Sequence, residues 1–352
     1  MTTDHERKAP RAGGYRPTGG FLSLFPGDET IIGLAPMAGF TEAPFRSLCA
    51  EEGASFTVTE LVSARGIRHD RDLKRSARYL LPTGGNRPWG IQLFGFDPGD
   101  FAYAVGRLLS DPLYSTVSFI DLNMGCPASK VVRDGAGAAL MRTPALAARI
   151  VEASVKAAEP FGKMVTVKMR SGFDRDHVNA PDIARIAEQS GASAVTVHAR
   201  TRDQYYGGAA DWQVIRRVRE MIAIPLLGNG DLTDTGDLVS MRRQTGCDGF
   251  QIGRAARGNP FIFSVLRGRA PAGQWLDVMT RHLNEMISLF GERTAVLEMR
   301  SHFAFYLRGF NGAVSLRRQI MKPETPEDVL AVLKKAAECR EAEQDTLSCF
   351  SQ

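Results

Sequence analysis

One cysteine stands in a setting that suits acid–base or nucleophilic chemistry. Cys126 lies in the string LNMGCP, where a Gly-Cys-Pro turn directly follows an apolar, strand-like run. A thiol has an ordinary pKa near 8.5, so at neutral pH it is mostly protonated and can act as a general acid. Lys130 and Arg133 follow closely and would lower that pKa, which suits a thiolate nucleophile instead. A buried, inert cysteine is the third alternative, and the local sequence leaves all three open.

Polar residues at the ends of other apolar runs suit a flat, conjugated cofactor. Lys168 ends the run MVTVKM, and a lysine at such a position needs a functional partner because burial of its charge is costly. A cation there would favour the negative charge that a reduced flavin ring develops near N1 and O2. Gln92 and Asn123 provide amide donors and acceptors for the edge of a pyrimidine ring. His198 suits a hydrogen bond to a ring or a phosphate, or a hydrogen-bonded place in the core.

Two glycine-containing turns favour a phosphate group. The strings GNGD at 228–231 and GRAARGNP at 253–260 follow the last two apolar runs. Backbone N–H groups in such turns bind phosphate, and Arg254 can add a charge-assisted contact. A third turn, APMAG at 35–39, has small residues where the backbone can pass close to a flat ring. Each turn alone is ordinary, but their joint placement indicates a phosphorylated cofactor such as FMN.

A repeating strand-and-helix unit must position these residues. Short apolar, β-branched runs occur at Ile31–Ala35, Phe56–Glu60, Trp89–Phe94, Val117–Asn123, Met164–Arg170, Ala194–His198, Ile224–Gly228 and Gly249–Gly253. Their continuous hydrophobicity is typical of parallel strands that are buried on both faces. Helical spacing appears between them at Pro98–Leu109, Pro144–Ala158, Pro181–Ser190, Trp212–Met221 and Asp234–Gln244.

The positions of the polar residues decide between two arrangements of eight strands. Such residues end or follow successive runs, namely Glu60, Gln92, Asn123, Lys168, His198, Asn229 and Arg254. A barrel gathers these strand ends into one mouth, whereas the competing doubly wound open sheet spreads them along a line. We therefore predict an α/β fold with a (β/α)8 TIM barrel over residues 28–270.

The pattern changes after Arg257. The segments Trp275–Phe290, Thr294–Arg308 and Pro326–Cys339 have helical spacing with no strands between them, which predicts a small C-terminal all-helical domain over residues 271–345. Within 293–322 a single acidic residue, Glu298, stands against the basic residues Arg293, Arg300, Arg308, Arg317, Arg318 and Lys322. Phe303, Phe305, Tyr306 and Phe310 are interleaved with them. A basic face of this kind suits a nucleic-acid backbone, although a solvated helix face with core aromatics has the same composition.

Overall composition restricts the class of protein. The chain has 352 residues and a formal net charge of +5, and no run approaches the ~18 apolar residues that span a membrane. We expect a cytoplasmic protein whose polar residues 1–27 form a disordered tail. The five cysteines show no C-x-x-C and no Cys/His metal spacing. This scatter favours reduced thiols and no metal site.

These strings together resemble the tRNA-dihydrouridine synthase family, and more narrowly its bacterial B-type branch. The matching strings are APMAGFTEAPFR, TELVSA, IQLFG, IDLNMGCPASKVVRDGAGAAL, VTVKMRSGFD, VTVHARTR, PLLGNGD and GFQIGRAARGNPFIF, in the family's order across roughly residues 30–265. The string with the cysteine is the most specific, and beyond 275 the likeness rests on HFAFYLRGF and SLRRQI. The chain has HART where many B-type members have HGRT, and an inserted-looking LLPTGGNRPW that could alter substrate choice.

The resemblance implies an FMN-dependent enzyme that takes hydride from NADPH and acts on tRNA. Hydride would pass from flavin N5 to C6 of a uridine while the matching cysteine, Cys126, protonates C5. By position, FMN would be held by Pro36, Met37, Ala38, Gln92, Lys168, His198, Asn229, Gly230, Asp231, Gly253 and Arg254. The uridine would face Asn123, Lys130 and Arg170, and the helical domain with Arg308, Arg317 and Arg318 would bind tRNA. We expect a monomer.

Other functions fit parts of this pattern. An FMN barrel that reduces free pyrimidines would need no basic helical module, so deletion of residues 275–352 would leave its turnover intact. A dihydrouridine synthase that acts on rRNA would differ only in its substrate. A catalytically silent RNA-binding barrel would be colourless when purified, and the presence of Cys126 and Lys168 counts against it.

Overall fold

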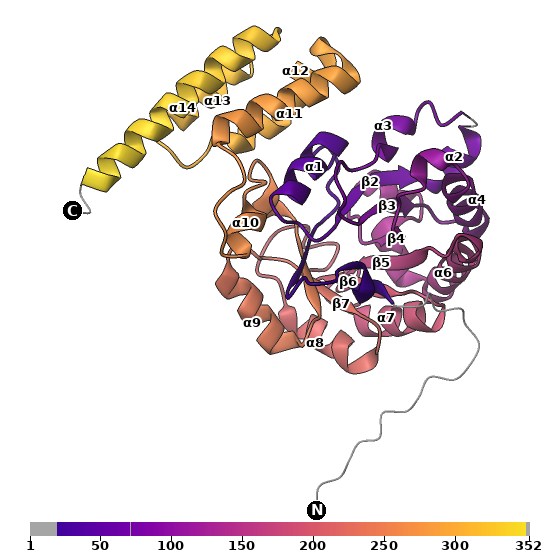
Figure 1. The fold of residues 1–352 in the computed structure, drawn as a ribbon. Helices are drawn as coiled ribbons and strands as arrows, with labels where there is room; N and C mark the ends of the chain where they lie inside the picture. Colours follow the sequence, from indigo (N-terminus) through magenta and orange to yellow (C-terminus); the bar gives the residue numbers. More distant parts are fainter. Residues whose placement is uncertain (1–19, 71, 350–352) are drawn as a thin grey trace, which may run out of the picture.

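The computed structural model describes residues 20–70 and 72–349, with side chains described as far as residue 343. A barrel of parallel strands and surrounding helices carries four further helices on one side (Figure 1). The strands are β1 Ile31–Leu34, β2 Thr57–Ser63, β3 Trp89–Phe94, β4 Phe119–Met124, β5 Met164–Arg170, β6 Ala194–His198, β7 Leu226–Asn229 and β8 Gly249–Ile252. The barrel helices are α1 Ala43–Glu51, α2 Ala64–His69, α3 Ala77–Leu80, α4 Pro98–Leu109, α5 Ser129–Arg133, α6 Pro144–Ala158, α7 Ala180–Gln189, α8 Trp212–Met221, α9 Thr235–Thr245 and α10 Ile262–Leu266.

The strands close into a ring. Their hydrogen-bonded order is β1-β8-β7-β6-β5-β4-β3-β2, and all the pairs are parallel. The two end strands also meet, because the Leu34 N–H donates to the Phe56 carbonyl at 2.9 Å and the Ser55 N–H donates to the Ile32 carbonyl at 2.8 Å. The predicted (β/α)8 barrel is therefore confirmed, and all the strands direct their carboxyl ends to one mouth.

The second strand runs further than its hydrophobic pattern predicts. The expected run ended at Glu60, but β2 continues to Ser63. The pairing with β3 shifts register between Val58 and Leu61, so Glu60 lies within an irregularity and not at the strand end. A bulge of this kind reverses the inward and outward alternation and hides the strand pattern in the sequence.

The first described residues of the chain pack against the end of the barrel opposite the mouth. Residues 1–19 of the expected disordered segment 1–27 lie outside the described residues, and the rest of that prediction is wrong. Phe21–Leu24 form a 3-10 helix (η1), and the side chains of Phe21 and Phe25 are buried. Phe21 makes edge contacts with Phe56 and Phe119 at ring-centroid distances of 5.7 and 5.4 Å. These rings fill the base of the barrel. The short segment is ordered because the barrel gives its aromatic side chains a surface to pack against.

The C-terminal helices pack around a core of their own. They are α11 Trp275–Phe290, α12 Glu292–Tyr306, α13 Ala313–Ile320 and α14 Pro326–Cys349, and α13 was not expected as a separate helix. Met279, Phe303 and Leu333 are among the buried side chains of this core. Arg281 on α11 forms a two-point ion pair with Glu51 on α1, and Arg78 pairs with Glu298 on α12 at 2.6 Å. The helical part is thus attached beside α1 and α3 (Figure 1).

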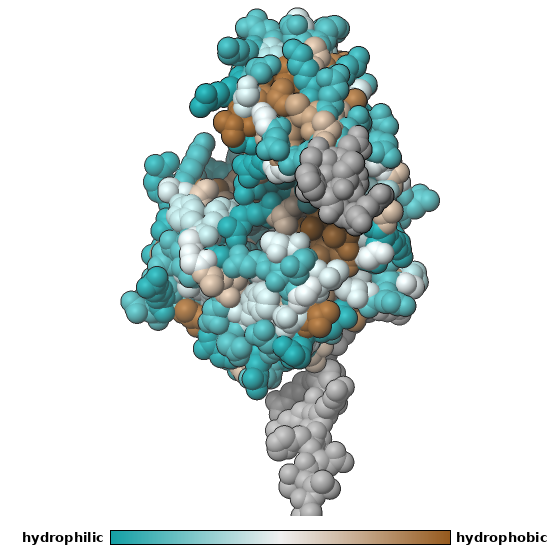
Figure 2. Space-filling model, turned by 90° about the vertical axis from the view of Figure 1, so that its left-hand side faces the viewer, coloured by the Kyte–Doolittle hydropathy of each residue, from teal (hydrophilic) through white to brown (hydrophobic). Residues whose placement is uncertain are grey.

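The surface is mostly hydrophilic on the face drawn in Figure 2, with hydrophobic residues on the upper lobe that the C-terminal helices form and further ones on the barrel below it. None of the helices in the described part of the chain is both long and apolar enough to cross a membrane.

Candidate active site

A cavity of about 750 Å³ opens at the carboxyl ends of the strands. It gathers most of the residues that the sequence singled out: Pro36, Met37, Ala38, Gln92, Asn123, Cys126, Lys168, Arg170, His198, Asn229, Gly230, Asp231, Gly253, Arg254 and, from just beyond α12, Arg308. Lys130 does not line the cavity and is exposed on α5. Arg317 and Arg318 also lie outside it on α13, where Arg317 donates to the Leu307 carbonyl at 2.6 Å. Glu60 does not line it either, and its carboxylate accepts the N–H of Gly39 at 2.6 Å.

A buried hydrogen-bonded chain runs from the barrel interior to the cysteine turn. The carboxylate of Asp121 on β4 accepts from the Gln92 amide at 2.7 Å and from the Thr166 hydroxyl at 2.7 Å. Gln92 then accepts from the Asn123 amide at 2.8 Å. The Asn123 carbonyl oxygen is left to accept the backbone N–H of Cys126 at 2.9 Å. Asp121 therefore fixes which way both amides point, since a carboxylate can only accept.

The thiol of Cys126 is half-buried just beyond β4. Burial raises its pKa, while the backbone N–H of Ala128 and the charge of Arg170 oppose that rise. The net direction contradicts the alternative in which Lys130 and Arg133 lower the pKa, and both of those side chains are exposed on α5. A thiol that keeps its proton suits proton donation more than nucleophilic attack.

A cation lies at the floor of the cavity. The Lys168 ammonium donates to the Asn229 side-chain oxygen at 3.2 Å, and Asn229 donates to the Gln251 carbonyl at 2.6 Å. Burial lowers the pKa of Lys168 to about 8, against the opposing charge of Asp121. Burial raises the pKa of Asp121 to about 6. Asp121 was not among the residues predicted for the site, although a carboxylate inside the apolar run FIDLNM could have indicated it.

Two polar atoms on strand residues of the cavity wall have no partner within the described residues. His198 Nδ1 and Gln251 Oε1 are buried and make no hydrogen bond. Burial lowers the pKa of His198 well below its usual value, and Lys168 and Arg170 lower it further, so the imidazole is neutral. Buried polar atoms in native proteins are nearly always paired, so these two mark positions that a bound ligand can satisfy.

The turn after β7 holds two arginines through one carboxylate. Asp231 accepts from Arg200 at 2.6 Å and from Arg254 at 2.7 Å. Its backbone has a φ of 55°, a left-handed conformation that is uncommon outside glycine. Burial alone would raise the pKa of Asp231, but Arg200, the Ala210 N–H and Arg254 outweigh it and lower the pKa. Asp231 thus positions Arg254 in the cavity, and Arg200, which the sequence did not single out, completes the pair.

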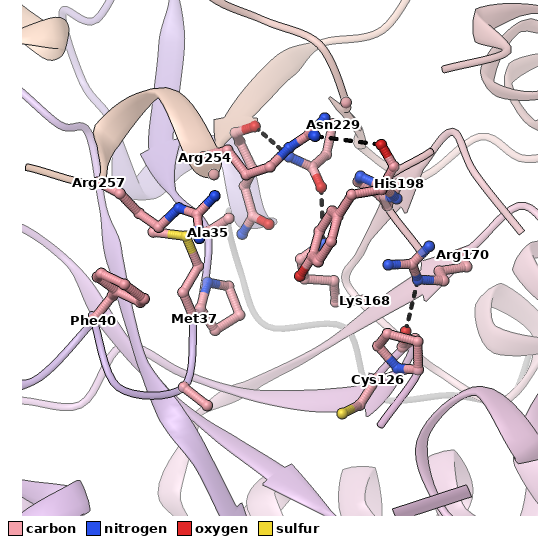
Figure 3. Close-up of a pocket in the computed structure, with 18 of the residues that line it drawn as sticks. Ala35, Met37, Phe40, Cys126, Lys168, Arg170, His198, Asn229, Arg254 and Arg257 are labelled. Carbon is pink, nitrogen blue, oxygen red and sulfur yellow. Dashed lines mark hydrogen bonds between the residues drawn. The ribbon is translucent and has the colours of Figure 1, made fainter. Parts of the chain in front are cut away.

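Aromatic and arginine side chains form the rim. Tyr206 is 53% exposed, and Arg170 and Arg254 lie over its ring at 5.7 and 5.1 Å. Arg170 also donates to the Gly125 carbonyl at 3.0 Å and to the Tyr205 carbonyl at 2.8 Å, which joins the cysteine turn to the loop after β6. Figure 3 shows Cys126 and Arg170 close together, with Met37, Phe40 and Arg257 grouped on another side of the cavity.

A second buried polar cluster joins the barrel to the helical part. Glu42 accepts hydrogen bonds from His282 on α11 at 2.7 Å and from His302 on α12 at 3.2 Å, and His282 Nδ1 lies 2.8 Å from the Tyr306 hydroxyl. Burial lowers the pKa of His282 to about 4. Burial alone would raise the pKa of Glu42, but the two histidines hold it well below its usual range.

The ligating atoms of Glu42, His282 and His302 lie within 4.8 Å of one another, a grouping that could hold a metal ion and that the residue spacing did not predict. Glu42 accepts from both histidines and the buried Arg46 balances its charge, while His302 Nδ1 is buried and has no hydrogen-bond partner within the described residues.

Comparison with known proteins places this geometry in a family. Residues 33–343 match the family described as "Dihydrouridine synthase (Dus)". The chain is 41% identical over 304 residues to a "Probable tRNA-dihydrouridine synthase" of Rhizobium leguminosarum bv. phaseoli, covering 85% of this chain and 93% of that protein. It is 38% identical over 319 residues to a protein of the same description from Mycobacterium tuberculosis, covering 85% and 80%. It is 37% identical over 295 residues to "tRNA-dihydrouridine synthase B" of Pseudomonas aeruginosa, covering 81% and 86%.

Proposed function

Because this chain belongs to the dihydrouridine synthase family, we propose that it is a tRNA-dihydrouridine synthase that uses FMN and NADPH to reduce the C5=C6 bond of specific uridines in tRNA. The observation that carries the proposal is the half-buried thiol of Cys126, whose raised pKa keeps it protonated beside the cavity. We take tRNA as the RNA class because the relatives described above are named tRNA-dihydrouridine synthases.

The cavity suits FMN in size and in chemistry. Its volume of about 750 Å³ lies within the range of roughly 300–1,000 Å³ that is usual for cofactor sites. The unpaired His198 Nδ1 and Gln251 Oε1 can bond polar ring atoms. We assign the remaining contacts to Pro36, Met37, Ala38, Gln92, Lys168, Asn229, Gly230, Asp231, Gly253 and Arg254, with the glycine turns nearest the phosphate. When bound, FMN reduced by NADPH supplies the hydride that adds to C6 of the uracil.

The chain's own residues complete the reduction. The C5=C6 bond of uracil is conjugated to the C4 carbonyl, so negative charge gathers toward C5 and O4 as C6 gains hydride. Cys126 gives its proton to C5, and Asn123 and Arg170 hold the cysteine turn in place for that transfer. The charge of Arg170 lowers the pKa of Cys126 against the effect of burial, so it also stabilises the thiolate that remains until the thiol regains a proton from water.

The helical part is proposed to bind the tRNA. We divide the chain into an FMN-binding barrel over residues 28–270 and a tRNA-binding helical domain over residues 271–345. Arg308 lines the cavity, and Arg318 is exposed on α13, which suits contacts to phosphates around an extruded uridine. Lys130, exposed beside the cysteine turn, is assigned to the same RNA.

Substitution of Cys126 by alanine tests the proton donor. In the Cys126→Ala variant, NADPH should still bleach the flavin under anaerobic conditions, while dihydrouridine formation in tRNA should fall roughly 10²–10⁴-fold, the usual contribution of a general acid. Cys339→Ala, a change of a half-buried cysteine in the helical part, serves as the matched control. Survival of both half-reactions would refute the acid assignment, and loss of FMN would make the residue structural.

The substrate is tested in cells. Dihydrouridine should disappear from particular tRNA positions when the gene is deleted and return with the wild-type chain but not with Cys126→Ala. Loss from rRNA alone would move the substrate to rRNA, and unchanged tRNA and rRNA would refute the proposed function. Deletion of residues 275–352 is a poor test of the free-pyrimidine alternative. It would remove His282 and His302, and the buried carboxylate of Glu42 would lose these two hydrogen-bond donors.

A further inference from the structure

Two arginines at the cavity edge lie over one phenylalanine ring. Arg308 and Arg257 have their guanidinium carbons 4.0 and 4.4 Å from the ring centroid of Phe305, near the end of α12. Arg257 also lies over Phe40, at 5.3 Å, and Figure 3 shows these two residues side by side. All four side chains line the cavity. The cluster therefore combines residues of the barrel with residues of the helical part.

The positive charge of this cluster is not neutralised. Within the described residues neither Arg257 nor Arg308 lies within 4.0 Å of a carboxylate, in contrast to Arg254, which pairs with Asp231. Arg257 Nε is buried and has no hydrogen-bond partner. Burial lowers the pKa of Arg257, and the like charges of Arg254 and Arg308 lower it further. Buried donors and crowded cations without a counter-ion point to an anionic ligand.

A close backbone approach builds the cluster. Gly258 has a φ of +64°, and a Cβ at this position would lie 2.5 Å from backbone atoms of Phe305 and Tyr306. Only glycine lets the loop after β8 come this near to α12. The approach sets Arg257, the preceding residue, against Phe305. The arrangement is therefore fixed by main-chain packing and does not depend on two long side chains meeting on an open surface.

The ring also determines how the arginines can bind. A guanidinium that stacks on an aromatic ring leaves its N–H edge free, and that edge matches two oxygens of a phosphate. We propose that Arg257 and Arg308, held on Phe305, form a phosphate subsite that binds the RNA phosphodiester next to the target uridine. This inference rests on the proposed function and specifies where the RNA backbone is held. The RNA is favoured as the source of the phosphate because half of the subsite, Phe305 and the exposed Arg308, comes from the helical part.

The 2′-phosphate of NADPH has the same chemistry, so the experiment must separate the two sources. The proteins are the FMN-loaded full chain, Arg257→Gln/Arg308→Gln, and Arg308→Gln alone, which changes only an exposed side chain and should fold normally. A double change of exposed arginines on barrel helices α6 and α9, Arg149→Gln/Arg243→Gln, removes the same charge elsewhere. The first readout compares binding of uridine with binding of uridine 3′,5′-bisphosphate. The second is the dependence of tRNA affinity on salt, and the third is anaerobic flavin bleaching by NADPH and by NADH.

We expect the wild-type chain to bind the bisphosphate at least roughly tenfold more tightly than uridine, since a charge-assisted contact is involved. The double variant at 257 and 308 should lose that preference, and its slope of log affinity against log salt should fall by about 1 for each lost contact. Arg308→Gln should show part of both effects and the control double variant neither. Bleaching by NADPH should be unchanged in all the variants.

Retention of both the bisphosphate preference and the salt slope in the 257/308 double variant would overturn the subsite. Loss of the NADPH preference over NADH, with RNA binding unchanged, would assign the phosphate to the dinucleotide and overturn the RNA assignment. A wild-type chain that binds no FMN and reduces no uridine would refute the proposed function, while the bisphosphate and salt readouts would still decide the subsite.

Discussion

Acid should weaken the packing of the helical part through His282, and a glutamine at that position should remove the effect. His282 is fully buried, with Glu42, His302 and Tyr306 around its ring. Its pKa is about 4 in the folded protein, against an ordinary value of 6.5. In His282→Gln the amide N–H₂ can still donate to Glu42, but the side chain no longer takes up a proton.

The sign and size follow from proton linkage. Above pH 6.5 the ring is neutral in both the folded and the unfolded chain, so it adds no pH dependence. As the pH falls below 6.5, the unfolded chain binds a proton that the folded chain refuses until about pH 4. The free energy of unfolding therefore falls, by about 2.5 kcal/mol between pH 7 and pH 4.5. Glu42, whose pKa is lowered on folding, contributes its own loss only below its ordinary value of 4.5.

Urea unfolding followed by circular dichroism at pH 7 and pH 4.5 measures this difference. The wild-type chain should lose about 2.5 kcal/mol more stability on acidification than His282→Gln does. His69→Gln, a change of an exposed histidine at the end of α2, controls for the substitution itself and should keep the wild-type profile. An equal loss in the wild-type chain and in His282→Gln would show that His282 is not held neutral, and the reasoning would fail.

Two further predictions concern the barrel. Phe21→Ala should lower the free energy of unfolding by about 3–5 kcal/mol, as is usual for a buried phenylalanine, and Leu22→Ala, a change of a 41% exposed neighbour, should cost far less in the same urea assay. Asp121→Asn should keep a hydrogen bond to Gln92 but remove the charge that raises the pKa of Lys168. The alkaline limb of flavin reduction by NADPH should then move to lower pH by roughly one unit or more. Asp121→Leu should also reduce dihydrouridine formation, because it frees the amides that hold the Cys126 turn.

Unchanged stability in Phe21→Ala would show that the base of the barrel does not depend on residues 20–27. For Asp121, an identical pH profile in the asparagine variant would mean that its charge does not act on Lys168. Full activity of the leucine variant would remove the hydrogen-bonded chain from the mechanism.

The sequence predicted those parts of the fold that depend on local patterns. Buried parallel strands give continuous apolar runs, so the eight strands and the polar residues at their ends could be read directly. The cavity consequently contains nearly all of the residues expected there. The bulge in β2 could not be predicted, because it breaks the alternation of side chains along the strand. The burial of Phe21 could not be predicted either, because it depends on a surface that only the closed barrel provides.

The contacts between distant residues were also beyond the sequence pattern. Glu42 meets His282 and His302 across more than two hundred residues, and no spacing rule relates them. Asp121 was readable as a carboxylate in an apolar strand, but its link to Cys126 depends on the register that sets Gln92 beside Asp121. Arg257 was visible in GRAARGNP, yet its position on Phe305 follows from the packing of Gly258 against α12.

The aromatic plug at the base of the barrel has a consequence for the order of events in turnover. Among the residues that the structure describes, Phe21, Phe25 and the rings around them close that end, and the cavity opens to solvent at the mouth. If the dinucleotide and the RNA both reach the flavin by that mouth, neither can bind while the other occupies it. The two substrates should therefore bind one after the other in a ping-pong mechanism, and the reduced flavin should hold the electrons after the dinucleotide leaves. Steady-state rates at varied NADPH and tRNA concentrations should then give parallel double-reciprocal lines.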